Sequence, residues 1–298
     1  MSLADFIEKN VPFSLPHHIT HYVEGQTPIS TNKAVGTALV SYLAIIFGLQ
    51  ELMKTRQPLK LTALFQLHNA FLTLGSGLLL VCMAEEVIPI LWRTGLFNAI
   101  CAEESWTPRL EFYYTINYFF KYVELIDTVF LVLKKKPLAF LHVYHHAVTA
   151  FLCFTQLNGH TSISWVVISL NLAVHVCMYY YYYATAGGKK IWWKRYLTTM
   201  QITQFVIDIF AVYFGTYSRY ASASWNLPNI GNCAGTESAA LLGCAVLTSY
   251  LFLFIKFYMD TYKKPAVKTQ QKVANGVANG IANGNGNAPA NGHVKKSQ

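Results

Sequence analysis

Residues 138–158 read LAFLHVYHHAVTAFLCFTQLN, an apolar stretch that is long enough to cross a membrane as a helix and that contains three histidines. His142, His145 and His146 are spaced i, i+3 and i+4, so a helix places all three on one face. Ionisable side chains at membrane depth are costly and are retained mainly where they have a function. The stretch therefore predicts a reaction centre inside a helical membrane protein.

The composition of the whole chain also indicates a membrane protein. Of its 298 residues, 53% are hydrophobic and 12% are charged, with a mean hydropathy of +0.31, whereas soluble domains carry about 25% charged residues. A shorter apolar segment at 87–100, which contains Pro89 and Arg93, is predicted to be re-entrant or interfacial. We expect an all-α, polytopic membrane protein whose seven transmembrane helices lie near 34–53, 62–83, 110–133, 138–158, 161–184, 196–217 and 238–259.

Basic residues gather in alternate connections between these spans, which predicts the orientation. The connections after the first, third and fifth spans and the C-terminal tail hold 16 of the 23 Lys and Arg residues. We therefore expect a lumenal segment at 1–33, a seven-helix domain at 34–262 and a cytosolic tail at 263–298. The net charge of +9 then reflects cytosolic loops rather than nucleic-acid binding. The tail repeats Ala-Asn-Gly, which predicts disorder, and it ends Lys295-Lys296-Ser297-Gln298, similar to a dilysine retrieval signal of the endoplasmic reticulum.

Polar residues form stripes on three further spans. At 1.5 Å per residue, each stripe lies about 6–14 Å from the predicted cytosolic end of its helix, at the depth of the histidines. Unrelated polar substitutions would scatter over many depths. The stripes therefore predict one buried polar chamber that opens to the cytosol. They consist of Lys121, Glu124, Asp127 and Thr128; of Asn171, His175, Tyr179 and Tyr182; and of Thr198, Gln201, Gln204 and Asp208.

The residues alone leave other functions open. His-x-x-His-His also occurs in membrane di-iron desaturases and hydroxylases, but this chain has too few embedded imidazoles for such a site. A zinc site on His142, His146 and a carboxylate is a further alternative, as is a proton-coupled transporter. We expect no metal, because the embedded lysine and glutamines favour organic chemistry. A structural role remains open for the Lys121–Glu124 pair, and Tyr181 and Tyr183 fit an aromatic belt.

The polar stripes resemble the signatures of the ELO family of very-long-chain fatty acid elongases. Asn171 precedes the third motif at the offset usual in the family. The sequence from Lys134 to Tyr217 is most similar to that of fungal members acting on saturated and monounsaturated chains. The matching motifs are Lys121-x-x-Glu124-x-x-Asp127-Thr128, His142-x-x-His145-His146, His175-x-x-Met178-Tyr179-x-Tyr181-Tyr182 and Thr198-x-x-Gln201-x-x-Gln204.

The resemblance implies a 3-ketoacyl-CoA synthase of the endoplasmic reticulum that condenses long-chain acyl-CoA with malonyl-CoA and releases CO2 and CoA. It implies seven helices, six of them in an inverted barrel around a closed-ended acyl tunnel, and no cofactor. The implied partners are membrane lipid, the reductases and dehydratase of the elongation cycle and a possible second copy of the chain. Basic cytosolic loops would attract the polyanionic CoA group.

Specific roles follow for some residues. A neutral imidazole can attack a thioester, and the resemblance favours His145 as nucleophile and His175 in malonyl-CoA activation, with Gln201 and Asn171 polarising carbonyls. Cys101 and Cys233 fall in the two long lumenal connections, where the compartment permits disulfides, so we expect them to be bonded, with two free thiols as the alternative. The bulky residues expected to limit product length near the lumenal ends of spans are Phe112, Ile116, Trp165, Phe210 and Phe214.

Overall fold

The structure, a computed structural model, describes residues 3–10, 12, 16–223 and 227–263. The tail that was expected to be disordered, with its terminal lysines, lies outside the described residues. Residues 1–257 form one compact unit. The described part of the second unit, 258–263, contains a short π-helix at Met259–Lys263. All the regular elements in the described residues are helical, as the sequence predicted.

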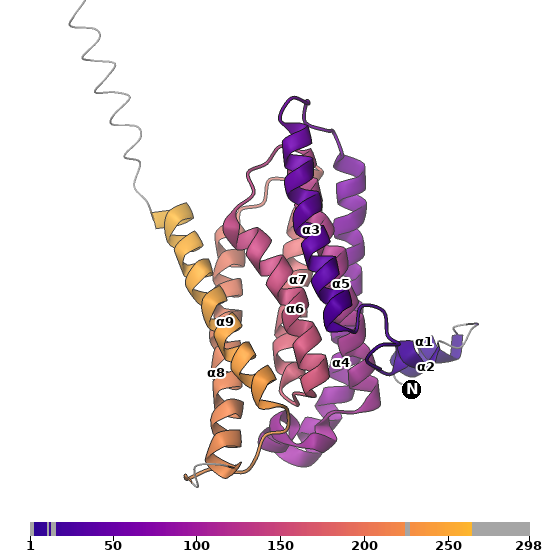
Figure 1. The fold of residues 1–298 in the computed structure, drawn as a ribbon, viewed down its shortest axis with the longest axis vertical. Helices are drawn as coiled ribbons and strands as arrows, with labels where there is room; N and C mark the ends of the chain where they lie inside the picture. Colours follow the sequence, from indigo (N-terminus) through magenta and orange to yellow (C-terminus); the bar gives the residue numbers. More distant parts are fainter. Residues whose placement is uncertain (1–2, 11, 13–15, 224–226, 264–298) are drawn as a thin grey trace, which may run out of the picture. The chain divides into compact units, whose positions relative to one another are not determined.

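Helices account for almost all of the compact unit (Figure 1). Side-chain caps define two of their starts, because Thr31 accepts a hydrogen bond from Ala34 N and Thr107 accepts one from Leu110 N. The helices are α1 (Leu3–Asn10), α2 (His17–Thr20), α3 (Asn32–Met53), α4 (Thr62–Cys101), α5 (Pro108–Leu133), α6 (Phe140–Gly159), α7 (Ser164–Ala186), α8 (Lys194–Ala223) and α9 (Glu237–Tyr258), with a 3-10 turn η1 (Glu103–Ser105).

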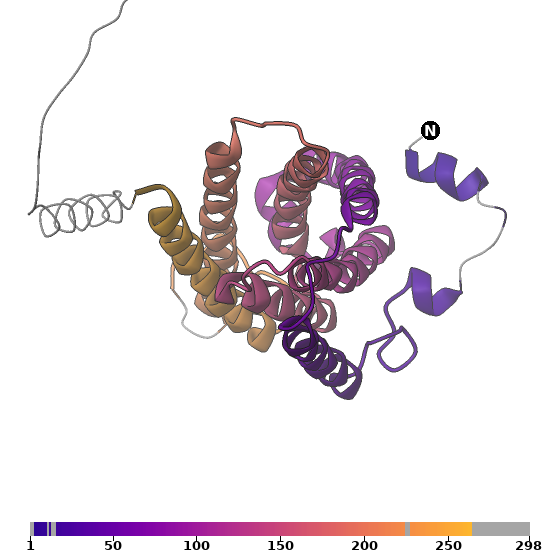
Figure 2. The same ribbon diagram turned by 90° about the horizontal axis from the view of Figure 1, so that it is seen from above.

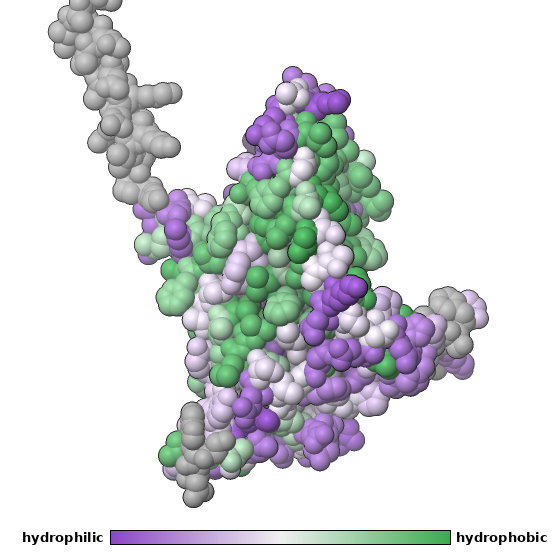
Figure 3. All heavy atoms as spheres, viewed as in Figure 1, coloured by the Kyte–Doolittle hydropathy of each residue, from purple (hydrophilic) through white to green (hydrophobic). Residues whose placement is uncertain are grey.

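Five of the seven predicted spans are confirmed by length and composition in the described residues, namely α3, α4, α7, α8 and α9. The other two, α5 and α6, have 26 and 20 residues and are therefore also about 30 Å long or longer. The mean hydropathy of these two helices is lowered by the buried polar residues that they carry, among them Lys121, Glu124 and His146. The chain is a polytopic membrane protein, and large apolar side chains cover much of the visible side of the bundle (Figure 3).

The helices of the compact unit surround a common axis. Figure 2 shows α4 to α9 around this axis, with α3 outside the ring against α5 and α6. The closest pair is α4 and α7, and the short connection between α5 and α6 makes these two helices antiparallel neighbours. Side-chain hydrogen bonds attach α9 to α6, such as Tyr144 to Ser249 and Thr149 to Tyr250.

The expected end of the second span at residue 83 and the separate segment at 87–100 are wrong. Helix α4 continues through Pro89 to Cys101, with a kink at Gly95, where φ is 78°. Pro89 has no N–H to donate to the carbonyl of Glu85, and its own carbonyl accepts a side-chain hydrogen bond from Arg93 Nε. The straight part of the helix before Gly95, residues 62–94, is about 50 Å long, which exceeds the roughly 30 Å thickness of the hydrocarbon core of a bilayer.

The two ends of the ring differ in chemistry. At the end that we name the disulfide end, Cys101 is bonded to Cys233, which confirms the predicted pairing. The loop around Cys233 is also held by backbone bonds from Ala234 N to Cys101 O and from Thr236 N to Gly159 O. The opposite, basic end carries Lys54, Arg56, Lys134–Lys136 and Lys189–Lys190, and Lys135 Nζ donates to the carbonyls of Lys54 and Arg56.

Removing the disulfide should destabilise the protein because it closes a chain segment of 132 residues. We expect the double variant Cys101→Ser/Cys233→Ser to lose about 2–4 kcal/mol of unfolding free energy. Thermal unfolding in detergent should show a lower midpoint, and a reductant should lower the wild-type midpoint without moving that of the variant. Cys177→Ser, which removes a free cysteine, is the control. Alkylation of both thiols without prior reduction would contradict the pairing.

Candidate active site

A buried cation organises the polar residues of α5 and α7. Lys121 and Glu124 are 2% and 3% exposed, and Lys121 Nζ donates to Glu124 Oε1 at 2.9 Å and to Asn171 Oδ1 at 2.8 Å. His175 completes the group, with Nε2 at 3.3 Å from Asn171 Nδ2 and Nδ1 at 3.2 Å from Glu124 Oε1. The sequence placed these four residues together, and the structure brings them into contact.

These contacts fix the protonation pattern of His175. Lysine can only donate, so the Asn171 amide must turn its oxygen to Lys121 and its NH2 group to His175. His175 Nε2 must then accept, which leaves the proton on Nδ1, beside the Glu124 carboxylate. The Nε2 lone pair of His175 thus faces an amide N–H, and its Nδ1 lies 3.2 Å from Glu124 Oε1 without a hydrogen bond to it.

The three histidines of α6 face the interior but meet different neighbours. His142 Nε2 lies 3.0 Å from Thr128 Oγ1, which also bonds the hydroxyl of Tyr42 on α3 at 2.8 Å. The ring of His146 lies 4.4 Å from that of His142 and 5.8 Å from that of His145. The helical spacing predicted that all three histidines lie on one face of α6. In the structure, His142 at one edge of this face meets α5, and His145 at the other edge meets α8 and α9.

His145 lies among aromatic rings on α8 and α9. Its ring is 4.7 Å from that of Tyr250, 5.8 Å from that of Phe254 and 6.3 Å from that of Phe205. Its Nδ1 is buried and has no hydrogen-bond partner among the described residues. Its electrostatic neighbours include His175, Lys121 and Glu124, so the α6 histidines and the α5–α7 group form one site.

His68 on α4 belongs to the site, although the sequence analysis gave it no role. Its Nε2 lies 2.8 Å from Asp127 Oδ1, and the Tyr179 hydroxyl donates to Asp127 Oδ2 at 2.8 Å. At 1.5 Å per residue, His68 lies about 9 Å from the start of its predicted span, the same depth as Asp127. Applying the depth argument to the second span would have found this residue.

The α8 motif and the end of the tyrosine run lie at the margin of this cluster. Gln204 Nε2 donates to the buried Asp208 at 2.9 Å, and Gln201 Nε2 lies 3.5 Å from Met178 Sδ. Neither glutamine has a hydrogen bond to a histidine in the described structure. Tyr182 is 37% exposed, with its ring 6.3 Å from that of Tyr179. No three His, Cys, Asp or Glu side chains in the described part of the chain gather in a group that could hold a metal ion.

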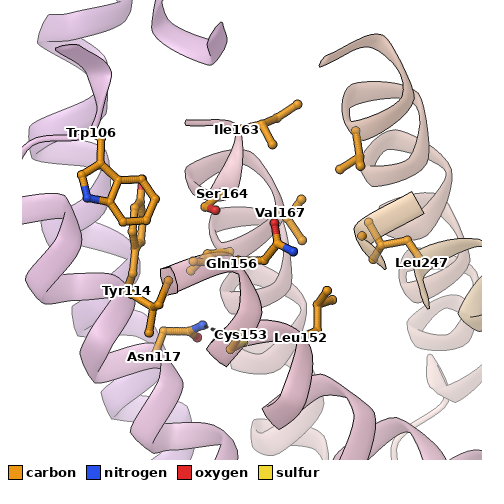
Figure 4. A pocket seen from close by; sticks show the side chains of 14 residues that line it. Trp106, Tyr114, Asn117, Leu152, Cys153, Gln156, Ile163, Ser164, Val167 and Leu247 are labelled. Carbon is orange, nitrogen blue, oxygen red and sulfur yellow. Dashed lines mark hydrogen bonds between the residues drawn. The ribbon is translucent and has the colours of Figure 1, made fainter. Parts of the chain in front are cut away.

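A narrow cavity of about 60 Å³ lies between the polar cluster and the disulfide end, although no residue of that cluster lines it. Figure 4 shows the Asn117 amide beside Cys153, whose Sγ accepts its hydrogen bond at 3.8 Å, with Trp106 and Tyr114 on one side of the cavity and Leu247 on the other. Seven residues along a helix are almost two turns, so they return to the same face about 10 Å away. The cavity residues Asn117, Leu152, Cys153, Ile168, Val212 and Leu247 lie seven residues from Glu124, His145, His146, His175, Phe205 and Phe254, respectively.

The five residues expected to limit product length do not line this cavity. Phe210 is 76% exposed on the outer surface, so its expected position inside a tube is wrong. Phe214 packs against Phe97, and Trp165 Nε1 donates to the carbonyl of Ala99. Bulk and helical depth selected these residues, but neither quantity tells the inner face of a helix from its outer face.

Removing the buried cation should be costly because it leaves a buried carboxylate without its main partner. We expect Lys121→Met to lower the free energy of unfolding by about 3–5 kcal/mol. Adding Glu124→Gln to this variant should recover much of the loss, measured by chemical unfolding in detergent micelles. Lys33→Met, at an exposed position at the start of α3, should change stability by less than about 0.5 kcal/mol. Equal effects of the two lysine variants would contradict a buried ion pair.

Residues 27–270 match the model of the family described as ELO: GNS1/SUR4 family. The chain is 52% identical over 253 residues to a Schizosaccharomyces pombe protein provisionally named fatty acid elongase 1, covering 84% of this chain and 75% of that protein. A second protein of that yeast, provisionally named fatty acid elongase 2, is 42% identical over 89% of this chain and 72% of its own. Fatty acid elongase A of Dictyostelium discoideum is 37% identical over 80% of this chain and 86% of its own.

These matches cover all the helices that carry the site, from α3 to α9. They confirm the family that the four sequence motifs indicated. The chain belongs to the ELO, or GNS1/SUR4, family of fatty acid elongases.

Proposed function

We propose that this fatty acid elongase, the 3-ketoacyl-CoA synthase of the condensing step, carries its acyl chain on His145 as an acyl-imidazole. The observation that supports this best is the unpartnered, buried Nδ1 of His145, at the point where the polar cluster meets aromatic side chains. A neutral imidazole is the form that can attack a thioester. His142 has a polar partner and His146 stacks on a neighbouring imidazole, whereas His175 also has an unpaired Nδ1 but accepts a hydrogen bond from Asn171 at Nε2.

The first half-reaction transfers the acyl group from acyl-CoA. The lone pair of one His145 ring nitrogen attacks the thioester carbonyl, and the carbon–sulfur bond breaks. The thiolate of CoA takes up the proton that the imidazole loses, so CoA leaves as a thiol. The product is a neutral acyl-imidazole, which is more reactive towards a carbon nucleophile than the thioester was.

The second half-reaction uses malonyl-CoA. As CO2 leaves, the electron pair of the broken carbon–carbon bond forms an enolate, which attacks the acyl-imidazole carbonyl. The carbon–nitrogen bond breaks, 3-ketoacyl-CoA forms, and His145 regains one proton from solvent. His175 can stabilise the enolate once the Asn171 amide turns away from Nε2 and that nitrogen takes up a proton, because the Glu124 carboxylate beside Nδ1 then balances the imidazolium charge. Asn171 serves as a positioning residue for His175, and the weakly bonded Gln201 amide remains available to a substrate carbonyl.

The cavity beyond His145 and His175 fits the fatty tail. It is lined mainly by apolar side chains, is continuous with the faces that carry the site, and ends near Trp106 and Tyr114. We propose that α4 to α9 form the barrel around this acyl path and that α5 and α6 also span the membrane, shielded by α3 and their other neighbours. The basic end would then face the cytosol and receive the CoA groups of both substrates.

Location and partners follow from the reaction and the sequence. Membership of the elongase family supports the membrane of the endoplasmic reticulum as the location. The 3-keto group must next be reduced, dehydrated and reduced again before another cycle, so the partners are the enzymes of those steps. The chain-length preference among saturated and unsaturated substrates is set by the cavity rather than by the reacting groups.

Intact-protein mass spectrometry tests the nucleophile. After mixing with acyl-CoA alone, the wild-type protein should gain the mass of one acyl group, and His145→Ala should not. His175→Ala should still form the adduct but should turn over more slowly by a factor of about 100 or more when malonyl-CoA is added. His160→Asn, outside the site and in a left-handed conformation that Asn tolerates, is the control. An unchanged adduct in His145→Ala would exclude this nucleophile.

Product length tests the acyl path. Val167→Phe adds bulk to the cavity wall and should shorten the products by whole two-carbon steps, measured by gas chromatography of the reaction products. Phe210→Ala removes bulk from the outer surface and should leave the distribution unchanged. Loss of total turnover without a shift in length would indicate destabilisation only. An unaltered distribution in an active Val167→Phe variant would show that the tail runs elsewhere.

A further inference from the structure

Three aromatic rings contact the imidazole of His145, and we name them together the aromatic cage. They belong to Phe205 on α8 and to Tyr250 and Phe254, which lie one turn apart on α9. All three side chains are buried. Their ring centroids lie 6.3, 4.7 and 5.8 Å, respectively, from that of His145. The imidazole therefore has apolar neighbours on the side that faces α8 and α9.

The rings of the cage also hold each other in place. The centroid of Phe205 lies 4.9 Å from that of Phe254 and 5.6 Å from that of Tyr250, in tilted and edge-to-face arrangements that aromatic pairs prefer. The Tyr250 hydroxyl donates to the carbonyl of His145 at 3.2 Å and lies 2.9 Å from Thr149 Oγ1. The one polar side-chain atom of the cage is thus bound to α6, which fixes the Tyr250 ring beside the imidazole.

Water has no access to Nδ1 of His145 in this arrangement. The atom is buried and has no hydrogen-bond partner among the described residues. The same three helices continue the apolar surface towards the disulfide end, because Leu152, Val212 and Leu247 line the cavity there. An acyl group on His145 whose tail enters this cavity would therefore lie against apolar side chains of α6, α8 and α9.

An acyl-imidazole needs such surroundings, since water attacks the same carbonyl carbon that the enolate must reach. In that side reaction the oxygen of water bonds to the acyl carbon and the carbon–nitrogen bond breaks. A free fatty acid leaves, and the imidazole recovers a proton from the water. The intermediate persists while CoA leaves and malonyl-CoA binds, so hydrolysis competes in every cycle. Sites that exclude water suppress this kind of loss.

We propose that the aromatic cage keeps water away from the acyl group on His145 and so decides whether the protein condenses or hydrolyses its substrate. The inference rests on the proposed acyl-imidazole. An opened cage leaves the nucleophile in place but admits water, so the same site would act as a thioesterase on long-chain acyl-CoA. A purely structural role of the three rings would affect folding but not the fate of an acyl group that is already attached.

The lifetime of the isolated acyl-enzyme tests the cage. The full-length protein in detergent is loaded with radiolabelled long-chain acyl-CoA, separated from excess substrate by rapid gel filtration and kept without malonyl-CoA. The release of labelled fatty acid is then followed. We expect Phe254→Ala and Phe205→Ala to release it about tenfold faster than the wild-type protein, or faster still. Phe254→Leu, which keeps most of the bulk and should fold like the wild-type protein, should lie between them.

Two further variants are controls. Phe252→Ala removes an exposed ring from the outer face of the same helix and should keep the wild-type lifetime. Tyr250→Phe keeps the ring of the cage and should change the lifetime by less than about twofold. Only protein that already carries the acyl group contributes to the measured rate, so a fraction that fails to fold does not affect it.

The outcomes separate this inference from the reaction on which it rests. Acyl-enzymes that form but decay at one rate in the wild-type protein and in the Phe254 and Phe205 variants would overturn the cage and leave the nucleophile intact. A wild-type protein that forms no acyl-enzyme would overturn both. Release from Phe252→Ala as fast as from Phe254→Ala would show a general loosening of α9 and would also overturn the cage.

Discussion

The burial of the Lys121 ammonium group is the constraint on which the site depends. A lysine with almost no solvent contact must find acceptors inside the protein, and here it has Glu124 and Asn171. Meeting that requirement orients the Asn171 amide, and the amide in turn decides which nitrogen of His175 holds the proton. A charge that takes no part in bond making thus determines the chemistry of a neighbouring imidazole.

The polar residues of the site explain how the helices are arranged. Helices α5 and α6 carry many buried polar side chains, and these would be unfavourable against lipid. The ring arrangement turns them towards the axis, while α3 covers part of their outer surface and contributes Tyr42 to Thr128. The strongly apolar α3 has large exposed side chains such as Val40 and Leu52, which suit a helix that faces hydrocarbon.

Much of the fold and site could be predicted from the sequence, because helical spacing and depth are one-dimensional quantities. The helix positions and the Lys121–Glu124–His175 group followed from them, and the Cys101–Cys233 bond followed from the place of both cysteines in predicted lumenal connections. The passage of α4 through Pro89 did not, because neighbouring groups can satisfy a proline in a helix. The direction of the Phe210 side chain and the partner of His68 depend on how each helix is rotated relative to its neighbours. The sequence of one span does not contain this information.

The disulfide end has a consequence for motion. The covalent bond, the kinked end of α4 and the backbone bonds of Ala234 and Thr236 hold the helices together at that end. At the basic end the helices are joined by loops, none of which has a disulfide in the described residues, and Lys135 Nζ donates hydrogen bonds to the carbonyls of Lys54 and Arg56. The least costly fluctuations of such a bundle separate the helices at the unpinned end. If the acyl chain occupies the axis as proposed, it would therefore leave through the gap that opens between the helices at the basic end, with the tightly held disulfide end as the pivot.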